Sequence, residues 1–231
     1  MFLPYLNQNS CLQNESKTLV TDIGEQVSST FTKFKKPSKV VLFFHGNAED
    51  LGSVRIVLKH QIAKEMKVTI VAVEYSGYGL FVGEKNADRV LEDCLAVYDF
   101  VKHEMKVADE DIILMGRSLG SSPSCYIAKE RPNVGSLILI SPFKSLREVA
   151  KDRVGKILSY LLAERYRNVD LIECVKCPVL IIHGMNDKLI DVSHSYTLKS
   201  HCGSQICKLI TPDHMDHNNY NMSDDIIKPI K

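Results

Sequence analysis

The sequence predicts an α/β protein in which helices cover both faces of a mostly parallel central sheet. Short apolar runs of strand length recur along the chain, and segments of helix length separate them. This alternation is typical of parallel sheets, because a strand rejoins its sheet in the same direction only through a long crossover, usually a helix. The 231 residues, of which 45% are hydrophobic, are sufficient for one sizeable core.

The strand candidates are mostly apolar, as strands buried on both faces are. They cover residues 40–44, 68–74, 111–115, 136–140, 178–183 and 208–211. The helix candidates between them cover residues 51–65, 86–103, 121–130, 144–165 and 193–201. Residues 1–17 are expected to form a flexible tail, and residues 18–34 a hairpin at the sheet edge. Residues 18–231 are expected to form a single domain, with a lid-like helical segment over about 144–172.

Composition argues against several classes of function. With 29 Lys+Arg against 28 Asp+Glu, the net charge is +1, so the electrostatic field does not favour a nucleic acid as partner. No apolar run is close in length to a membrane-spanning helix, which needs about 20 residues, and the first residues lack the features of a secretory signal. Seven cysteines, an odd number, favour reduced thiols over a disulfide framework. We therefore expect a cytoplasmic protein, of an oligomeric state that the sequence leaves open.

A nucleophile elbow is predicted where Gly116-Arg117-Ser118-Leu119-Gly120 follows the strand candidate at 111–115 and precedes a helix candidate. The G-x-S-x-G turn is so tight that the residues two before and two after the serine must lack side chains. The turn would present Ser118 at the carboxyl edge of the sheet, where the sites of such folds lie. We predict that Ser118 is a nucleophile, rather than an exposed serine in an ordinary tight turn.

Two backbone N–H groups are predicted to stabilise an oxyanion. One belongs to Leu119, directly after the nucleophile, and the other to Asn47, in the loop after the strand candidate at 40–44. Gly46 would let the backbone approach a substrate. Asn47 is also expected to begin the next helix as an N-cap partnered by Asp50. His45, beside the glycine, is interpreted as structural.

A serine hydroxyl needs a base and an orienting acid, and the elbow predicts the chain order Ser, Asp, His. Asp187 follows the strand candidate at 178–183 and is the predicted acid. Asp191 is the alternative, but it precedes a helix candidate, where a carboxylate is usually a cap. His214 and His217 both follow the last strand candidate, and we favour His217 as the base because it lies nearer the expected final helix.

Other motifs are interpreted as structural, and no cofactor or metal is predicted. Cys174 and Cys177 have redox-motif spacing, but a strand rather than a helix follows them, and the spacing of the other cysteines fits no zinc pattern. After Gly77-Tyr78-Gly79, the third glycine and the acidic residue about 20 residues on are not arranged as a dinucleotide site needs, so a tight turn is the better interpretation.

The helix candidate at 144–165 is amphipathic. Its apolar side chains recur at helical spacing, at Val154, Ile157, Leu158, Leu161 and Leu162. Core packing is the leading interpretation, and a lid over an acyl pocket or a face that touches a membrane surface are the alternatives.

From about residue 39 to residue 220, the chain resembles serine hydrolases of the three-layer α/β-hydrolase fold. More narrowly, it resembles the alpha/beta hydrolase domain-containing protein 17 family through HGNAEDLG at 45–52, EYSGYG at 74–79, PVLIIHG at 178–184 and His217-Asn218. The resemblance implies a membrane-associated acyl-protein thioesterase that removes palmitate from cysteines, with Ser118, Asp187 and His217 in the catalytic roles. It also implies peripheral membrane contact through acylated amino-terminal cysteines, for which Cys11 is the candidate.

The predicted function is therefore hydrolysis of an acyl ester or an acylated-protein thioester through an acyl-serine. The alternatives are a general carboxylesterase, a lipase-like or peptidase-like hydrolase, and a non-catalytic binding protein of the same fold.

Overall fold

A central sheet organises the computed structural model, which describes residues 20–22, 39–79, 86–155 and 164–231. Within these ranges the sheet has seven strands. They are β1 (Val20–Asp22), β2 (Val40–Phe44), β3 (Thr69–Val73), β4 (Ile112–Arg117), β5 (Ser136–Ile140), β6 (Val179–Ile182) and β7 (Cys207–Ile210). Their order across the sheet is β1-β3-β2-β4-β5-β6-β7. Strands β2 to β7 are parallel, whereas β1 pairs antiparallel with β3 at the edge.

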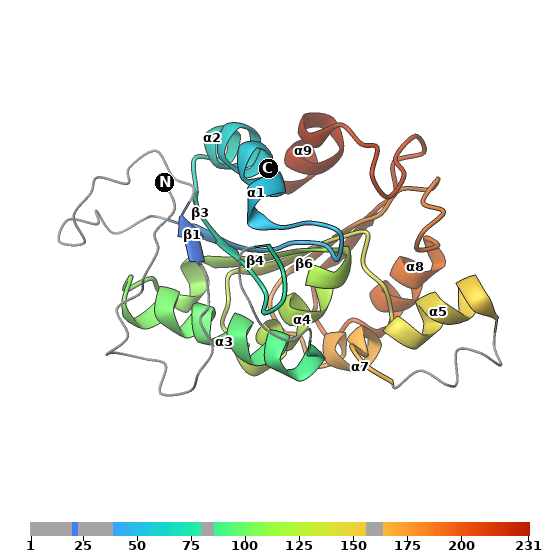
Figure 1. Cartoon of the computed structure of the whole chain (residues 1–231), viewed down its shortest axis with the longest axis horizontal. Coiled ribbons are helices and arrows are strands. Elements are labelled where there is room, and N and C mark those ends of the chain that lie inside the picture. Colours follow the sequence, from blue (N-terminus) through green and yellow to red (C-terminus); the bar gives the residue numbers. More distant parts are fainter. Residues whose placement is uncertain (1–19, 23–38, 80–85, 156–163) are drawn as a thin grey trace.

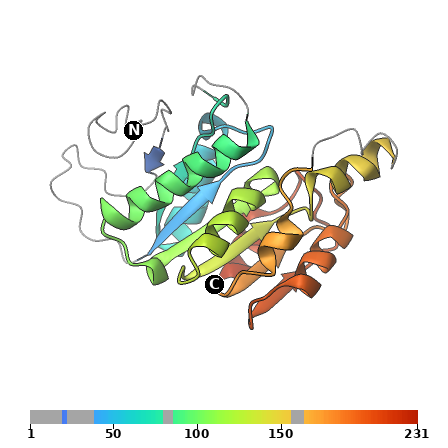
Figure 2. The ribbon, with the colours of Figure 1, turned by 90° about the horizontal axis from the view of Figure 1, so that it is seen from below.

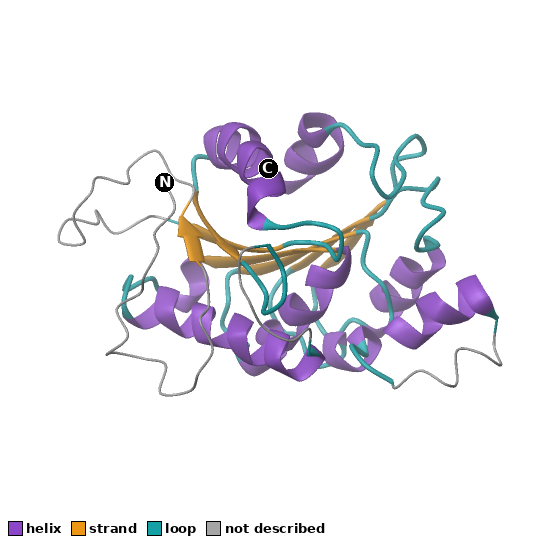
Figure 3. Cartoon of the chain, viewed as in Figure 1, coloured by secondary structure: helices purple, strands orange, loops and turns teal. Residues whose placement is uncertain are grey.

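Helices cover both faces of this sheet, which gives three layers (Figure 1 and Figure 3). One face carries α3 (Ala87–His103), α4 (Ser121–Glu130), α7 (Asn168–Ile172) and α8 (Ser193–His201), and Figure 2 shows the molecule from this side. The other face carries α1 (Leu51–Val57), the π-helical η1 (Leu58–Ala63), α2 (Lys64–Met66), the π-helical η4 (Met222–Ile227) and α9 (Lys228–Ile230). A further helix, α5 (Leu146–Val154), is joined to α8 by a hydrogen bond between Asp152 and His194.

Burial on both faces explains why the strands are continuous apolar runs. Along β2, Val40, Leu42 and Phe44 pack into the core layer beneath α3 and α4. The alternate residues Val41 and Phe43 pack into the layer beneath α1 and η1. Successive side chains of a strand point to opposite faces, so a strand with helices on both sides needs an apolar residue at every position.

The predicted strands and helices match the structure closely. The strand predictions at 40–44 and 136–140 coincide with β2 and β5, and the other four differ by one or two residues at an end. The helix predictions at 121–130 and 193–201 coincide with α4 and α8. The expected helix at 51–65 is continuous from α1 to α2, with a π-helical stretch in its middle that no pattern in the sequence indicated.

The prediction of one long helix over 144–165 was wrong. Helix α5 begins at Leu146, where the Ser145 side chain accepts the Glu148 N–H at 3.3 Å, and it ends at Val154. Gly155 follows with a φ of 83°, a conformation that ends an α-helix and that glycine adopts without strain. The apolar positions 157, 158, 161 and 162, on which the lid and membrane interpretations depended, lie outside the described residues.

The amino-terminal predictions are described only in part. Within the expected hairpin at 18–34, Val20–Asp22 forms the edge strand β1, whose partner is β3. The rest of that hairpin, the expected tail at 1–17 and Cys11 lie outside the described residues. At the other end, the expected final helix is present as η4 and α9, and Ile226 and Ile227 of η4 are buried in the core layer beneath α1.

Candidate active site

Ser118 lies in the turn between β4 and α4, within a short 3₁₀ segment, η3 (Ser118–Gly120). Its φ is 50°, in the left-handed region that non-glycine residues rarely occupy and that the serine of a nucleophile elbow is forced to adopt. A Cβ at Gly116 would lie 2.2 Å from the Gly120 carbonyl oxygen, and a Cβ at Gly120 would lie 2.1 Å from the Phe44 carbonyl oxygen. Both glycines are therefore sterically required, as the spacing predicted.

Hydrogen bonds from behind hold this strained turn. The Ser121 hydroxyl donates to the Ser118 carbonyl oxygen at 2.6 Å, and the Asn168 amide donates to the Ser121 hydroxyl oxygen at 3.0 Å. Asn168 is fully buried and also donates to the Phe143 carbonyl oxygen at 2.9 Å. The first turn of α7 thus supports the backbone on which the serine sits.

His217 connects Ser118 to Asp187. Its Nε2 lies 3.2 Å from Ser118 Oγ, and its Nδ1 lies 2.7 Å from Asp187 Oδ2. An ionised carboxylate can only accept, so Nδ1 carries the proton and Nε2 is left to accept the serine hydroxyl proton. All three residues are buried. The structure thus brings together the three side chains that chain order had selected.

Asp187 is held as an ionised carboxylate. Its Oδ1 accepts the backbone N–H groups of Leu189 and Ile190, each at 2.9 Å, and His183 Nε2 lies 3.3 Å from its Oδ2. Burial by itself raises the pKa of Asp187, but the hydrogen bonds from His183, His217 and the Ile190 N–H outweigh burial and hold this pKa well below its usual value. The side chain therefore stays charged at neutral pH, as an orienting acid must.

The competing residues point elsewhere. Asp191 Oδ1 accepts the N–H of Ser193, the first residue of α8, at 2.9 Å, although the N-cap of this helix is Val192 and not Asp191. His214 Nε2 lies 3.0 Å from Asp225, on η4, and 69% of its side chain is exposed. Neither residue has a hydrogen bond to Ser118 within the described parts of the chain.

The loop after β2 lies beside the nucleophile elbow. Phe44 pairs with Gly116 across β2 and β4, and the close approach of Gly120 to the Phe44 and His45 carbonyl oxygens packs the two turns together. The predicted oxyanion donors, Asn47 and Leu119, belong to these two adjacent segments. Their placement at the carboxyl ends of neighbouring strands is consistent with a shared oxyanion site.

Asn47 does not begin the next helix, so that part of the prediction was wrong. The N-cap of α1 is Asp50, whose side chain accepts the Ser53 N–H at 2.7 Å, and the Ser53 hydroxyl oxygen accepts the Asp50 N–H at 3.0 Å. This reciprocal pair satisfies two backbone donors at once and sets the start of α1 at Leu51. Asn47 remains in the loop, where its Oδ1 accepts the Tyr78 hydroxyl at 2.5 Å.

A buried histidine and glutamate brace this loop from below. His45 Nε2 lies 2.9 Å from Glu74 Oε1, and its Nδ1 lies 2.8 Å from the Gly46 carbonyl oxygen. The other oxygen of Glu74 accepts the Leu51 N–H at 3.0 Å. The Tyr75 hydroxyl donates to the His45 carbonyl oxygen at 2.9 Å, and the two rings stack with centroids 4.2 Å apart. His45 thus has the structural position expected for it.

Several polar residues around the site were not predicted from the sequence. His183, Glu74 and Glu49 contact Asp187, His45 and Arg117 respectively. The sequence does give one indication for Arg117, because a charged residue in a turn packed tightly between strand and helix needs polar partners. The other three sit at the ends of strands or in loops and have no local pattern that identifies their partners.

The motifs interpreted as structural are consistent with that interpretation. Cys174 is exposed and Cys177 is buried, and burial raises the pKa of the Cys177 thiol to about 12. Gly77 and Gly79 have φ values of 82° and 50°, which fits a tight turn after β3. In the described ranges, no group of three or more His, Cys, Asp and Glu side chains is placed to hold a metal ion.

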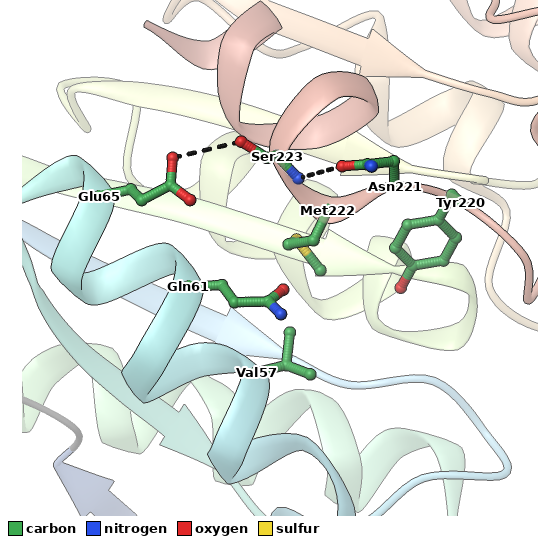
Figure 4. Close-up of a pocket in the computed structure, with 7 residues that line it drawn as sticks. All are labelled: Val57, Gln61, Glu65, Tyr220, Asn221, Met222 and Ser223. Atoms are coloured by element: carbon green, nitrogen blue, oxygen red, sulfur yellow. Dashed lines mark hydrogen bonds between the residues drawn. The ribbon is translucent and has the colours of Figure 1, made fainter.

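Two depressions flank the site. One, of about 680 Å³, lies between α5 and the loop that carries Asp187, and Met185, Leu189 and Arg153 line part of it. The other, of about 520 Å³, lies between the helices of the opposite face, where Gln61 lies near Met222 and Glu65 faces Ser223 (Figure 4). Tyr220 places one end of this second depression close to the loop of His217.

No helix in the described parts of the chain combines the length and the apolar character needed to cross a bilayer.

Comparison with known proteins places these features in context. A family model described as serine aminopeptidase, S33, matches residues 35–173. The chain is 33% identical over 172 residues to the alpha/beta hydrolase domain-containing protein aho-3 of Caenorhabditis elegans, and 31% identical over 183 residues to the human alpha/beta hydrolase domain-containing protein 17B. These alignments cover 74% and 79% of this chain but 50% and 62% of the relatives, so the chain spans about half to three fifths of their length.

Solved structures of low sequence identity share the fold. They include acetyl xylan esterase 1 from Thermoanaerobacterium sp. (TM-score 0.69, 18% identity, 92% of this chain and 77% of that chain). They also include a monoacylglycerol lipase from Paleococcus ferrophilus (TM-score 0.67, 17% identity, 93% and 96%) and mouse alpha/beta hydrolase domain-containing protein 10 (TM-score 0.65, 18% identity, 96% and 99%). The predicted α/β-hydrolase fold and the predicted resemblance to the domain-containing protein 17 family are confirmed.

Proposed function

This chain belongs to the serine aminopeptidase S33 family, and we propose that it hydrolyses carboxylic esters or thioesters through an acyl-serine intermediate. One observation carries the proposal: the hydrogen-bonded series from Asp187 through His217 to Ser118, on a serine whose backbone is held in the left-handed conformation of an elbow. A serine in an ordinary turn needs neither the strained backbone nor the oriented base.

In the proposed mechanism, Ser118 Oγ attacks the carbonyl carbon while His217 Nε2 takes the hydroxyl proton. Asp187 keeps the histidine in the tautomer that leaves Nε2 unprotonated and stabilises the imidazolium that forms. The backbone N–H groups of Leu119 and Asn47 stabilise the oxyanion of the tetrahedral intermediate. When the intermediate collapses, the bond to the alcohol or thiol breaks and His217 returns its proton to the leaving group. Water, activated by the same histidine, then hydrolyses the acyl-serine.

The finer proposal is that the substrate is an acylated protein and the bond a cysteine thioester. Its support is the similarity to the alpha/beta hydrolase domain-containing protein 17 relatives, together with an apolar surface next to the acid. Met185 and Leu189 flank Asp187 on one loop, with 43% and 41% of their surfaces exposed, and the Tyr196 hydroxyl lies 3.9 Å from Met185 Sδ. Exposed apolar side chains at the rim of a site suit a long acyl chain or a lipid surface.

A cytoplasmic location with peripheral membrane contact is part of the same proposal, because acylated proteins are held at membranes by their acyl chains. The described cysteines, from Cys94 to Cys207, are all free thiols, which suits a reducing compartment.

Labelling with a fluorophosphonate probe tests the reaction class. Wild-type protein is expected to label covalently, and the Ser118→Ala variant, whose lost hydroxyl leaves the fold's packing almost unchanged, is expected not to label. Folding of both is checked by circular dichroism and thermal unfolding. A folded wild type that takes no serine-dependent label would make the chain a binding protein with a hydrolase fold.

A substrate panel then tests the finer proposal. Acylated cysteine peptides and p-nitrophenyl esters with chains from two to sixteen carbons are compared by kcat/KM, with peptidyl p-nitroanilides to test the peptidase alternative suggested by the family description. A preference for long-chain thioesters supports an acyl-protein thioesterase. A preference for short esters indicates a general carboxylesterase instead.

A further inference from the structure

Arg117 is a buried arginine inside the nucleophile elbow, between Gly116 and Ser118. The elbow places no demand on the side chain at this position, since its pattern requires only the two glycines and the serine. Yet only 9% of the Arg117 side chain is exposed. Burying a charged group is costly unless it is paired and hydrogen-bonded, so the burial of this guanidinium must be explained by its partners.

One side of the guanidinium holds the loop of the histidine. Its Nη2 donates to the His217 carbonyl oxygen at 2.7 Å and to Asn218 Oδ1 at 3.0 Å. The Tyr220 ring lies beside it, with the Arg117 Cζ 5.9 Å from the ring centroid, within the range of a cation–π contact. The backbone of His217 is thus tied directly to the residue that precedes Ser118.

The other side of the guanidinium holds the loop of Asn47. Its Nη1 lies 2.7 Å from Glu49 Oε1, and the second oxygen of Glu49 accepts the Gly46 N–H at 2.6 Å. A Cβ added at Gly46 would lie 3.0 Å from both Arg117 Nη1 and Glu49 Oε2, so a side chain at this position would crowd the pair. The predicted oxyanion donor Asn47 is the next residue along the chain.

Stability alone does not account for this arrangement. A buried ion pair adds little net stability over an apolar pair of similar size, because desolvation offsets most of the attraction. The Arg117 Nε, moreover, is buried with no hydrogen-bond partner among the described residues. What a planar guanidinium does supply is geometry, since its forked donors fix two acceptors at set distances and directions.

We infer that Arg117 is a positioning residue, which registers the loop of His217 and the loop of Asn47 against Ser118. The inference rests on the proposed function for its kinetic consequences. A shift of about 1 Å in a reacting group lowers rates by about 100-fold, so loops from opposite ends of the chain need such a registration. Arg117 meets this need because its backbone is covalently joined to the nucleophile itself.

The test compares Arg117→Met with a matched control, Arg131→Met. Arg131 is also paired with a carboxylate, Asp99 at 3.0 Å, and its Cζ lies 5.6 Å from the Tyr98 ring centroid, but it lies at the end of α4, away from the site loops. For a p-nitrophenyl ester, Arg117→Met is expected to lower kcat by about 10- to 100-fold with KM changed by less than about threefold. Arg131→Met is expected to change kcat by less than about twofold. All rates are normalised to folded protein.

Arg117→Lys provides the conservative variant. A lysine keeps the charge but offers no planar fork, so it can hold one loop and not both. Its kcat is expected to fall between those of the wild type and Arg117→Met. If Arg117→Lys and Arg117→Met both turn over like the wild type, the inference is wrong, and it is equally wrong if KM carries the whole effect.

Hydrogen exchange gives a readout that does not depend on activity. In Arg117→Met, the backbone amides of residues 46–52 and 216–220 are expected to exchange faster together, while those of α3 and β5 keep wild-type protection. Unchanged protection in both loops would overturn the inference even if no substrate is ever found. Conversely, absence of fluorophosphonate labelling in the wild type would overturn the proposed function and leave this exchange test decisive for Arg117.

Discussion

The His217–Asp187 and His45–Glu74 pairs are both buried at the carboxyl edge of the sheet, and they differ in what the second ring nitrogen meets. In the His217–Asp187 pair, that nitrogen faces the Ser118 hydroxyl at 3.2 Å. In the His45–Glu74 pair, it faces the Gly46 carbonyl oxygen at 2.8 Å. A hydroxyl can give up a proton and a carbonyl oxygen cannot. A histidine paired with an acid is therefore not in itself a catalytic signature.

The two pairs also differ in their surroundings. Asp187 accepts backbone N–H groups from its own loop, so its carboxylate is oriented by residues directly beside it in the sequence. Glu74 accepts the Leu51 N–H, 23 residues away in the chain, so its pair joins the end of β3 to the start of α1. The first pair is built to orient a proton acceptor, and the second to hold a loop in place.

The largest expected effect comes from removing the imidazole that faces Ser118. His217→Ala is expected to lower kcat/KM by about 10⁴-fold or more, because both proton transfers depend on it. His214→Ala is the matched control. His214 lies three residues before His217 and is also paired with a carboxylate, that of Asp225. It is expected to leave kcat/KM within about twofold of the wild type. A loss with His214→Ala and none with His217→Ala would reverse the assignment of the base.

Removing the charge of the orienting acid is expected to have a smaller effect. Asp187→Asn should lower kcat by about 10³- to 10⁴-fold, because an amide that donates to Nδ1 favours the tautomer in which Nε2 is protonated. Steady-state kinetics with a p-nitrophenyl ester measure this loss. Asp191→Asn, on the same loop, is the control and should retain kcat, since the Asp191 carboxylate accepts the Ser193 N–H and not a hydrogen bond from His217. Equal losses in both variants would contradict the distinction.

Breaking the second pair is expected to affect stability more than chemistry. Glu74→Gln leaves the buried His45 without its carboxylate and should lower the free energy of unfolding by about 3–5 kcal/mol. Urea unfolding measures this change, with the exposed Glu110→Gln as control, expected within about 0.5 kcal/mol of the wild type. The kcat of the folded fraction should fall far less than in His217→Ala, because the pair holds a loop and transfers no proton. A normal stability with a lost kcat would place the His45–Glu74 pair in the chemistry.

The smallest effect is the pH dependence that Asp187 gives to stability. Its pKa is lowered in the folded state, so the stability that it contributes is present above its unfolded pKa, about 3.9, and is lost as the pH falls below that value. The difference in unfolding free energy between the wild type and Asp187→Asn should therefore shrink between about pH 5 and pH 3. Urea unfolding at both pH values measures it. A difference that is constant or grows toward low pH would show that the carboxylate is not stabilised in its charged form.

Much of the fold could be predicted because it depends on neighbouring residues. Burial on both faces makes every position of β2 apolar, and every position of β5 after Ser136, and this pattern is visible without any tertiary information. The helix at 144–165 was predicted too long because apolar spacing outweighed one glycine, whose positive φ at 155 ends α5. The N-cap at Asp50 was misplaced at Asn47 because both residues can cap, and only the pairing with Ser53 decides between them.

By itself, the sequence determined the fold class, the elbow at Ser118 and the short set of acids and bases, because steric limits in a tight turn and burial of a strand act over a few residues. That His217 rather than His214 faces Ser118 is decided only by the tertiary structure. The two histidines are three residues apart on one loop, and η4 packs so that its Asp225 pairs with His214 and leaves His217 facing the serine. The tertiary structure also decided the partners of Arg117, which contacts the His217 backbone 100 residues away. Contacts over such distances depend on how the whole sheet stacks its loops, and no local pattern encodes them.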